Sequence, residues 1–199
     1  MNINYHKLLL EELENMKSKK RLLLHSCCGP CSTYVISFLS DYFDITVIYY
    51  NPNIEPESEY LKRKDEQIKF IKNYKSKNNL DLLDIEYEND KFKNIIKGLE
   101  SKLEGGSRCS KCFKLRLEKT ASIASLNNYD YFGTTLTVSP HKNANIINEI
   151  GKSLEKEYNI KWLIADFKKN EGYKKSIILS KQYDLYRQDY CGCTSSKKT

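Results

Sequence analysis

Seven cysteines stand in three tight groups that are far apart in the chain. The first group has three cysteines around a Gly-Pro step, and the other two are a Cys-x-x-Cys and a Cys-x-Cys pair. Thiols at such short spacing can bind a metal or do redox chemistry. We expect the fold to bring all three groups to one place. The seven residues are Cys27, Cys28, Cys31, Cys109, Cys112, Cys191 and Cys193.

Three kinds of chemistry use cysteines in this pattern. Four thiolates from two pairs suffice for a tetrahedral zinc ion, but zinc leaves the third group without a role. Cys28-Gly29-Pro30-Cys31 has the form of a dithiol redox motif at a helix start, although the adjacent Cys27 and the two further pairs are foreign to that motif. An iron–sulfur cluster takes up to four thiolates, and seven thiols leave a surplus for a second metal or a dithiol. We favour the iron–sulfur interpretation, with zinc and dithiol chemistry as open alternatives.

The composition bounds the class of protein. The chain has 199 residues, of which 40% are hydrophobic, so one domain with a real core is the default. The formal charge of +7 permits a polyanionic partner such as RNA, although a solvated lysine-rich surface is the plainer explanation. No apolar run reaches about 18 residues, and the first residues do not resemble a signal peptide. We therefore expect a cytoplasmic protein, in which clustered cysteines favour metal or redox chemistry over disulfides.

The elements that must position the cysteines follow from hydrophobic periodicity. Apolar residues at helical spacing predict helices over 5–18, 32–40, 57–75, 90–97, 113–126, 144–158 and 171–181. Short runs rich in β-branched and aromatic residues predict strands over 21–25, 44–50, 82–87, 129–135 and 162–167. This alternation predicts a three-layer α/β fold with a mostly parallel sheet. We expect one domain over 1–199, with a lead-in helix in 1–20 and a cysteine-bearing tail over 183–199.

Three predicted loops follow strands and should share one rim of the sheet. They are the first cysteine loop and the loops 51–53 and 134–142. In open α/β sheets, ligands bind beyond the carboxyl ends of the strands. The cysteines of the first loop are therefore expected at a binding rim.

A series of short blocks runs in order from about residue 22 to residue 195. The blocks are Leu-Leu-His-Ser-Cys-Cys-Gly-Pro-Cys-Ser from Leu23, Tyr-Asn-Pro-Asn-Ile from Tyr50, Glu-Tyr-Leu-Lys-Arg from Glu59, Arg-Cys-x-x-Cys from Arg108 with Arg116-Leu117, Thr-Thr-Leu-x-x-Ser-Pro-x-Lys from Thr134, Asp-Phe-Lys-Lys from Asp166, Gly-Tyr-x-x-Ser from Gly172, and Tyr-Arg-Gln-x-Tyr-Cys-Gly-Cys from Tyr186. Together they resemble the QueH-type epoxyqueuosine reductases. So many matched blocks are a far more specific signal than a lone Cys-x-x-Cys.

The resemblance implies an oxidoreductase that reduces epoxyqueuosine to queuosine at the wobble position of tRNA. Its partners would be the anticodon loop of tRNA and an external low-potential electron donor. It also implies a [4Fe–4S] cluster with an additional mononuclear iron close by. The chemistry suits these cofactors, because removing an epoxide oxygen takes two electrons and a Lewis acid can polarise the leaving oxygen.

The implied fold is Rossmann-like, similar to the nucleotide-hydrolase-like domains of ATP-using tRNA-modifying enzymes. The first loop lacks their Ser-Gly-Gly-x-Asp-Ser phosphate cradle and has cysteines in its place, so we expect no ATP. Cys27, Cys28, Cys109 and Cys112 are expected to supply most cluster ligands. Cys191 and Cys193 are then divided between the cluster and the extra iron, and Cys31 is either a ligand or a structural thiol at the helix start.

Several residues outside the cysteine groups are candidates for substrate binding or catalysis. Tyr190 is a candidate proton donor to the departing oxygen, and Asp166 is a candidate to orient a lysine or bind metal. The candidates for shaping the pocket or anchoring substrate are His25, Tyr49, Asn51, Asn53, Lys142 and Arg187.

Plainer explanations exist for some of these residues. His25 could be a packed histidine, 51–53 a simple turn and Asp166 an acidic turn residue. Arg63 could form a helix-surface ion pair with Glu59, four residues earlier. For RNA, the lysines that could form a phosphate-binding patch are Lys168, Lys169, Lys174 and Lys175.

Overall fold

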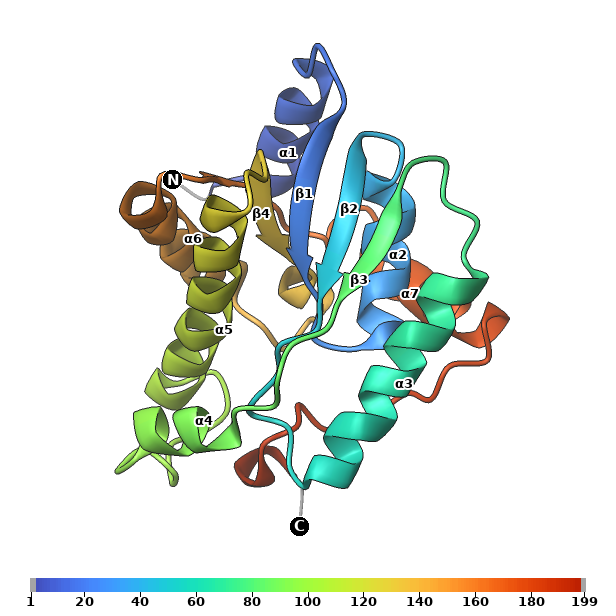
Figure 1. Ribbon diagram of the computed structural model, residues 1–199. Helices are drawn as coiled ribbons and strands as arrows, with labels where there is room; N and C mark the ends of the chain where they lie inside the picture. Colours follow the sequence, from blue (N-terminus) through green and yellow to red (C-terminus); the bar gives the residue numbers. More distant parts are fainter. Residues whose placement is uncertain (1–2, 198–199) are drawn as a thin grey trace.

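The computed structural model describes residues 3–197, so the first two and last two residues of the predicted domain lie outside it. The strands are β1 (Lys20–His25), β2 (Phe43–Ile48), β3 (Leu80–Leu83), β4 (Tyr131–Thr134) and β5 (Lys161–Trp162). They form one sheet in the order β3-β2-β1-β4-β5, and every neighbouring pair is parallel (Figure 1). The predicted α/β class with a mostly parallel sheet is confirmed.

Helices cover both faces of the sheet. They are α1 (Tyr5–Glu14), α2 (Gly29–Leu39), α3 (Glu57–Asn73), α4 (Asn89–Ile96), α5 (Ser107–Leu126), α6 (Ala144–Tyr158) and α7 (Gly172–Gln182), with short 3-10 turns at Leu136–Val138 and Thr194–Ser196. One face packs against α1, α2 and α3, and the other packs against α5 and α6 (Figure 1). Within residues 3–197, no helix is long and apolar enough to cross a membrane.

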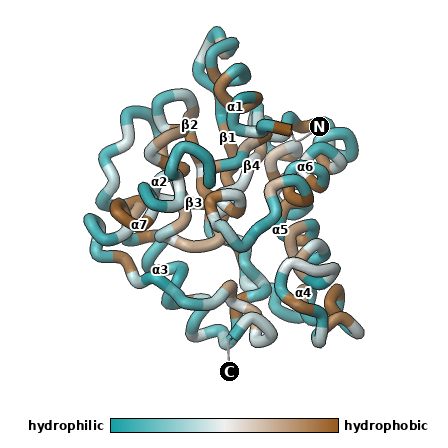
Figure 2. The backbone as a smooth tube through the Cα atoms, turned by 180° about the vertical axis from the view of Figure 1, so that it is seen from behind, coloured by the Kyte–Doolittle hydropathy of each residue, from teal (hydrophilic) through white to brown (hydrophobic). Residues whose placement is uncertain are grey.

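The central strand β1 shows why the sheet is covered on both sides. Leu22 and Leu24 belong to one buried cluster and Leu23 to the other, because successive strand side chains point to opposite faces. The helices alternate hydrophilic and hydrophobic segments along the chain, as Figure 2 shows, so their apolar stripes can meet these strand faces.

Several element boundaries differ from the sequence-based expectation. α1 ends at Glu14 rather than near residue 18, β3 is Leu80–Leu83 rather than 82–87, and α5 begins at Ser107 rather than at residue 113. Two further differences have a clear local cause. α2 begins at Gly29 rather than near residue 32, so Cys31 lies in its first turn. β5 ends at Trp162 rather than near residue 167. At Ala165, the backbone forms hydrogen bonds with the side chain of Asn148 in α6 instead of with a neighbouring strand. The Asn148 side chain donates to the Ala165 carbonyl at 3.0 Å and accepts from its N–H at 3.2 Å, which replaces the ladder of a neighbouring strand.

The strand order creates a switch point between β1 and β4. The chain leaves β1 toward β2 on one side, and it leaves β4 toward β5 on the other. A crevice therefore opens beyond the carboxyl ends of these two strands, which is where open α/β sheets bind ligands. The first cysteine loop follows β1, and the loop that ends at Lys142 follows β4.

Candidate metal centre and active-site cavity

The first cysteine group lies where β1 leads into α2. The sulfur atoms of Cys27, Cys28 and Cys31 all lie within 4.8 Å of one another, and those of Cys27 and Cys28 are 3.9 Å apart. The turn between them requires Gly29, because a Cβ there would approach the Glu66 carbonyl group of α3 to 3.1 Å. We call these three residues the three-thiol group. Its donor set can hold a metal ion.

Hydrogen bonds across the switch point join the three-thiol group to the loop after β4. The backbone N–H of Cys27 donates to the Thr135 hydroxyl at 3.2 Å, and that hydroxyl donates to the Cys27 sulfur at 3.5 Å. Hydrogen bonds with Cys28 and Cys31 hold the pKa of Cys27 well below its usual value. The same contact with Cys27, together with burial, raises the pKa of Cys28 to about 12. Metal binding at this group would displace the protons that these thiols hold.

The other four cysteines lie around the start of α5 and the C-terminal segment, and we call them the four-thiol group; within residues 3–197 only the first three cysteines bring their sulfurs within 4.8 Å of one another. Cys109 and Cys112 are one turn apart at the start of α5, and Cys112 shares an apolar cluster with Cys193. Burial, together with negative charge on Cys191, Cys193 and Cys109 and against the opposing charge of Arg116, raises the pKa of Cys112 to about 12. Cys112 and Cys193 therefore lie close enough to the other thiols to feel their charge, although the two pairs come from segments about 80 residues apart.

Gly192 lets the C-terminal segment reach this place. Its φ of +138° is a backbone conformation that favours glycine, and a Cβ would lie 2.9 Å from Cγ1 of Ile54. The Gly192 carbonyl accepts a hydrogen bond from the Glu55 N–H at 2.9 Å. The Cys-Gly-Cys sequence therefore packs against the loop after β2 and is hydrogen-bonded to it.

A cavity of about 380 Å³ lies between the two cysteine groups, and we call it the cysteine cavity. Cys27 and Cys31 line it from one group and Cys191 from the other. The segment 187–191 forms one wall, together with Ser196. Thiols from two of the three cysteine groups of the sequence therefore face one space, whereas Cys109 and Cys112, which were predicted to join them, are not in its lining.

Three arginines are buried around the cysteine groups, and each has guanidinium nitrogens that lack an acceptor within residues 3–197. They are Arg63, Arg108 and Arg116, all at most 2% exposed. Burial alone would lower the pKa of Arg116, but negative charge on Cys112, Cys191 and Cys27 raises it. Buried cationic donors without acceptors are costly, so the site is built to receive negative charge. Thiolates with a bound metal or an iron–sulfur cluster fit that requirement.

Sequence reasoning missed the role of Arg108 and Arg116. A signal was present, because Arg108 is next to Cys109 and Arg116 is one helical turn after Cys112. The Arg116 Nε donates to the Cys112 carbonyl at 3.2 Å, and its Nη1 donates to Oδ1 of Asn51 at 3.3 Å. These bonds aim the rest of the guanidinium at the cysteine cavity, which Arg116 lines.

The structure places His25 inside the protein with both ring nitrogens engaged. Nδ1 lies 2.9 Å from Oγ1 of Thr134, and Nε2 lies 3.1 Å from the Tyr50 carbonyl. Burial and the nearby Arg116 charge lower its pKa to about 3, so the ring is neutral. His25 ties the carboxyl ends of three strands together and does not line the cysteine cavity.

The predicted residues after β2 support the rim rather than line the cavity. Tyr49 is buried, and its hydroxyl donates to the Tyr60 carbonyl at 3.4 Å. Asn51 donates to the Ser26 carbonyl at 2.8 Å, which joins this loop to the three-thiol group. Asn53 is buried beside Gly192, and its Oδ1 lacks a hydrogen-bond partner within residues 3–197.

Lys142, Arg187 and Tyr190 do line the cysteine cavity. Burial would lower the pKa of Lys142, but negative charge on Cys191, Cys27 and Cys31 raises it above its usual value. The Arg187 guanidinium lies over the Tyr173 ring at 5.3 Å. Tyr190 is part of the lining, and its hydroxyl donates to the Glu55 carbonyl at 3.0 Å.

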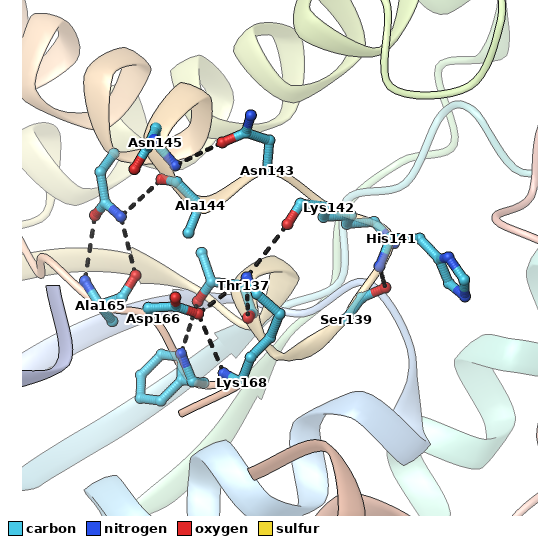
Figure 3. Close-up of polar contacts among 12 residues, drawn as sticks. Thr137, Ser139, His141, Lys142, Asn143, Ala144, Asn145, Ala165, Asp166 and Lys168 are labelled. Carbon is cyan, nitrogen blue, oxygen red and sulfur yellow. Dashed lines mark hydrogen bonds and ion pairs between the residues drawn. The ribbon is translucent and has the colours of Figure 1, made fainter. Parts of the chain in front are cut away.

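Asp166 lies outside the lining of the cysteine cavity and orients a lysine (Figure 3). Its carboxylate pairs with the Lys168 ammonium at 2.9 Å. That ammonium also donates to the carbonyls of Thr137 and Lys142, at 3.3 Å each. The pair therefore fixes the backbone of the loop that carries Lys142.

Comparisons with known proteins show the family of the chain. A family model described as Epoxyqueuosine reductase QueH matches residues 22–199, which include all seven cysteines. The chain belongs to the QueH family. A relative from Staphylococcus epidermidis named Epoxyqueuosine reductase QueH is 46% identical, and the match covers 96% of this chain and 83% of that protein. The relative of the same name from Streptococcus pyogenes is 40% identical, with 98% and 79% covered.

Membership in the QueH family extends to distant relatives. The Epoxyqueuosine reductase QueH of Thermotoga maritima is 35% identical, and the match covers 88% of this chain and 89% of that protein. The resemblance found in the sequence is thereby confirmed, and the chain is an oxidoreductase of this family. Among solved structures, a predicted subunit of a tRNA methyltransferase from Methanocaldococcus jannaschii matches with a TM-score of 0.48 and 17% identity over 82% of this chain and 74% of that one.

Proposed function

We propose that the protein reduces epoxyqueuosine to queuosine at the wobble position of tRNA. The observation that carries the proposal is the meeting of thiols from both cysteine groups at one cavity above the switch point. The reaction adds two electrons and two protons, breaks both C–O bonds of the epoxide, forms a C=C bond and releases the oxygen as water. An external low-potential donor supplies the electrons.

The two cysteine groups suit two different metal sites. In a tetrahedral site with metal–sulfur bonds of about 2.3 Å, sulfurs lie about 3.8 Å apart, close to the 3.9 Å between Cys27 and Cys28. We therefore assign a single iron ion to the three-thiol group. The four-thiol group offers the four thiolates that a [4Fe–4S] cluster takes. When bound, the cluster supplies low-potential electrons and the single iron polarises the leaving oxygen.

This division differs from the sequence-based expectation in two respects. That expectation joined Cys27 and Cys28 to the Cys109–Cys112 pair and left Cys31 ambiguous. The proposal here keeps Cys31 with its two neighbours, because their three sulfurs lie within 4.8 Å. It also keeps Cys191 and Cys193 together with α5.

The chain's own side chains complete the reaction site. Lys142 keeps its proton because negative charge faces it, so its ammonium can stabilise the oxygen as the epoxide opens. Arg187 and the Tyr190 ring line the same cavity and would hold the cyclopentane and the base. His25 and Asn51 hold the rim rigid rather than touch the substrate.

The experiment that tests the activity uses anaerobically purified protein with a chemical low-potential reductant. Epoxyqueuosine-containing tRNA is incubated with it, and the nucleosides are measured by mass spectrometry. We expect conversion to queuosine by the wild type and none by Cys191→Ala. Absence of conversion by wild-type protein that contains iron and sulfide would contradict the proposal.

The division of the cysteines has its own readout, which is the iron and sulfide content of each variant. We expect Cys109→Ala to lose sulfide together with most of the iron. Cys31→Ala should lose about one iron and keep its sulfide, since a mononuclear site contains none. Equal sulfide loss in both variants would overturn the division. A colourless wild type that binds only zinc after anaerobic reconstitution would favour the zinc-binding alternative.

A further inference from the structure

The cysteine cavity has neighbours of opposite charge on its two sides. Beyond β4 and β5 lies a cavity of about 470 Å³, lined by Lys142, Lys168 and Lys169 with Asp166 as the only acidic residue. We call it the basic cavity. It shares Lys142 with the cysteine cavity, so the two spaces adjoin at that residue.

A third cavity, of about 640 Å³, lies on the opposite side, beyond β2 and β3. Five carboxylates and two lysines line it, and we call it the acidic cavity. It adjoins the cysteine cavity through Tyr190, whose hydroxyl donates to the carbonyl of Glu55 in the acidic lining. The carboxylates belong to Glu55, Glu57, Glu86, Glu88 and Asp90.

We infer that the RNA backbone beside the modified nucleotide lies over the basic cavity, where Lys169 contacts a phosphate, and is kept off the acidic side. This inference rests on the proposed function and adds to it the side of the cysteine cavity on which the RNA backbone lies. A nucleotide whose base enters the cysteine cavity leaves its flanking phosphates at the mouth of that cavity. Phosphates are drawn to cations and repelled by carboxylates, so the two neighbouring cavities are not equivalent.

Lys169 is the lysine of the basic cavity that is free to bind a phosphate. The Lys168 ammonium is held by Asp166 and two backbone carbonyls, as Figure 3 shows. Lys142 faces the thiols, whose negative charge raises its pKa. Lys169 is exposed, and its ammonium makes no ion pair or hydrogen bond within the described part of the chain.

The surroundings of Lys169 favour a polar ligand over an apolar one. Asn143 and Asn145 line the basic cavity with it. The Asn143 side chain accepts from the N–H groups of Asn145 and Ile146, at 2.9 and 3.4 Å, and so caps α6. The exposed Asn145 amide remains available to a phosphate or ribose oxygen.

The test compares Lys169→Met with Lys93→Met, which removes a lysine from the acidic cavity. The probe is queuosine-containing tRNA, the product, and its dissociation constant is measured from low to high salt. We expect Lys169→Met to raise that constant several-fold and to reduce the log–log salt slope by about 0.7 to 0.9, the value for one lost phosphate contact. Lys93→Met should leave both quantities unchanged. An unaltered thermal unfolding midpoint shows that each variant folds.

The outcomes separate this inference from the proposed function. If the wild type binds the tRNA and Lys169→Met binds it equally well with the same salt slope, the RNA backbone does not lie over the basic cavity. The inference is then wrong and the proposed function stands. If Lys93→Met weakens binding as much as Lys169→Met, the attraction is diffuse and the inference also fails. A wild type that binds no tRNA overturns both.

Discussion

Arg63 is a buried cation that holds the C-terminal segment against α3. Its Nε pairs with Glu59 at 2.7 Å, its Nη1 donates to the Cys191 carbonyl at 3.2 Å, and its guanidinium lies 4.7 Å from the centre of the Tyr190 ring. Arg63→Met leaves the largely buried Glu59 carboxylate without its partner. We expect the free energy of unfolding to fall by about 3 kcal/mol, measured by urea denaturation of the metal-free protein.

Lys64→Met is the matched control for this substitution. Lys64 is the next residue of the same helix, and its partner Asp84 is 72% exposed. Exposed pairs contribute little, so this variant should lose less than about 1 kcal/mol. Equal losses in the two variants would show that Arg63 has no special role. Arg63→Lys should fall in between, because an ammonium keeps the charge but cannot bridge Glu59 and two carbonyls as a planar fork does.

The sequence alone could not place Arg63. Its spacing from Glu59 predicts a surface ion pair, and the pair itself is present in the structure. The burial comes from Tyr190 and Cys191, which are more than 120 residues away, so no local pattern reveals it. Contacts of this kind depend on where an irregular segment folds back, and periodicity carries no signal for such segments.

At the scale of elements, the packing of α6 on β5 depends on a glycine. A Cβ at Gly151 would lie 2.2 Å from the Trp162 indole. That ring is nearly fully buried, packs on Phe132 and donates its N–H to Asn148 at 3.0 Å, so it has little freedom to move. Gly151→Ala should therefore destabilise the protein by about 1–3 kcal/mol, although alanine is the better helix former by about 1 kcal/mol.

Urea denaturation checks this prediction with Ser153→Ala as the control on the same helix. Ser153 is exposed, so its substitution should change the free energy of unfolding by less than about 0.5 kcal/mol. A Gly151→Ala protein that is more stable than the wild type would mean that helix propensity outweighs the indole contact.

The helices and strands were largely predictable because their patterns are strong, and the exceptions have local causes. The α2 start at Gly29 was missed because a Cys-Gly-Pro-Cys turn looks like a loop, while proline is well tolerated in the first turn of a helix. The early end of β5 was missed because its apolar residues still suit a strand. Asn148 replaces the ladder bonds there, and a side chain from another helix cannot be read from the strand itself.

At the scale of the whole molecule, the rule that ligands bind at the carboxyl ends of parallel strands was enough to predict where the first cysteine group lies. It could not predict that the three sulfurs of the first group lie within 4.8 Å of one another, nor the three buried arginines around the cysteines. The order of the strands decides which loops face each other across the switch point. Sequence periodicity specifies the strands but not their order.

The C-terminal segment and α5 meet chiefly through cysteines and buried cations, so bound metal should tie the two together. Without metal, Cys112 and Cys193 are buried thiols, and burial together with negative charge on the neighbouring thiols raises the pKa of both. Metal that binds only the folded chain adds its binding free energy to stability. We expect the anaerobically reconstituted protein to unfold at higher urea than the metal-free protein, and limited proteolysis to cleave the metal-free form first within 183–197.

The size of that stabilisation should depend on pH in a definite direction. Metal binding displaces protons from thiols, so at higher pH fewer protons oppose it and the stabilisation grows. The difference between the urea midpoints of metal-loaded and metal-free protein should therefore be larger at about pH 8 than at about pH 6.5, because thiols such as Cys28 and Cys112, whose pKa is raised to about 12, still hold their protons over this range. A difference that is constant across this range would mean that the thiols are not the groups that bind the metal.

The proteolysis experiment has its own contrary outcome. Cleavage in 183–197 at equal rates with and without metal would mean that the segment is held by Arg63 and its neighbours alone.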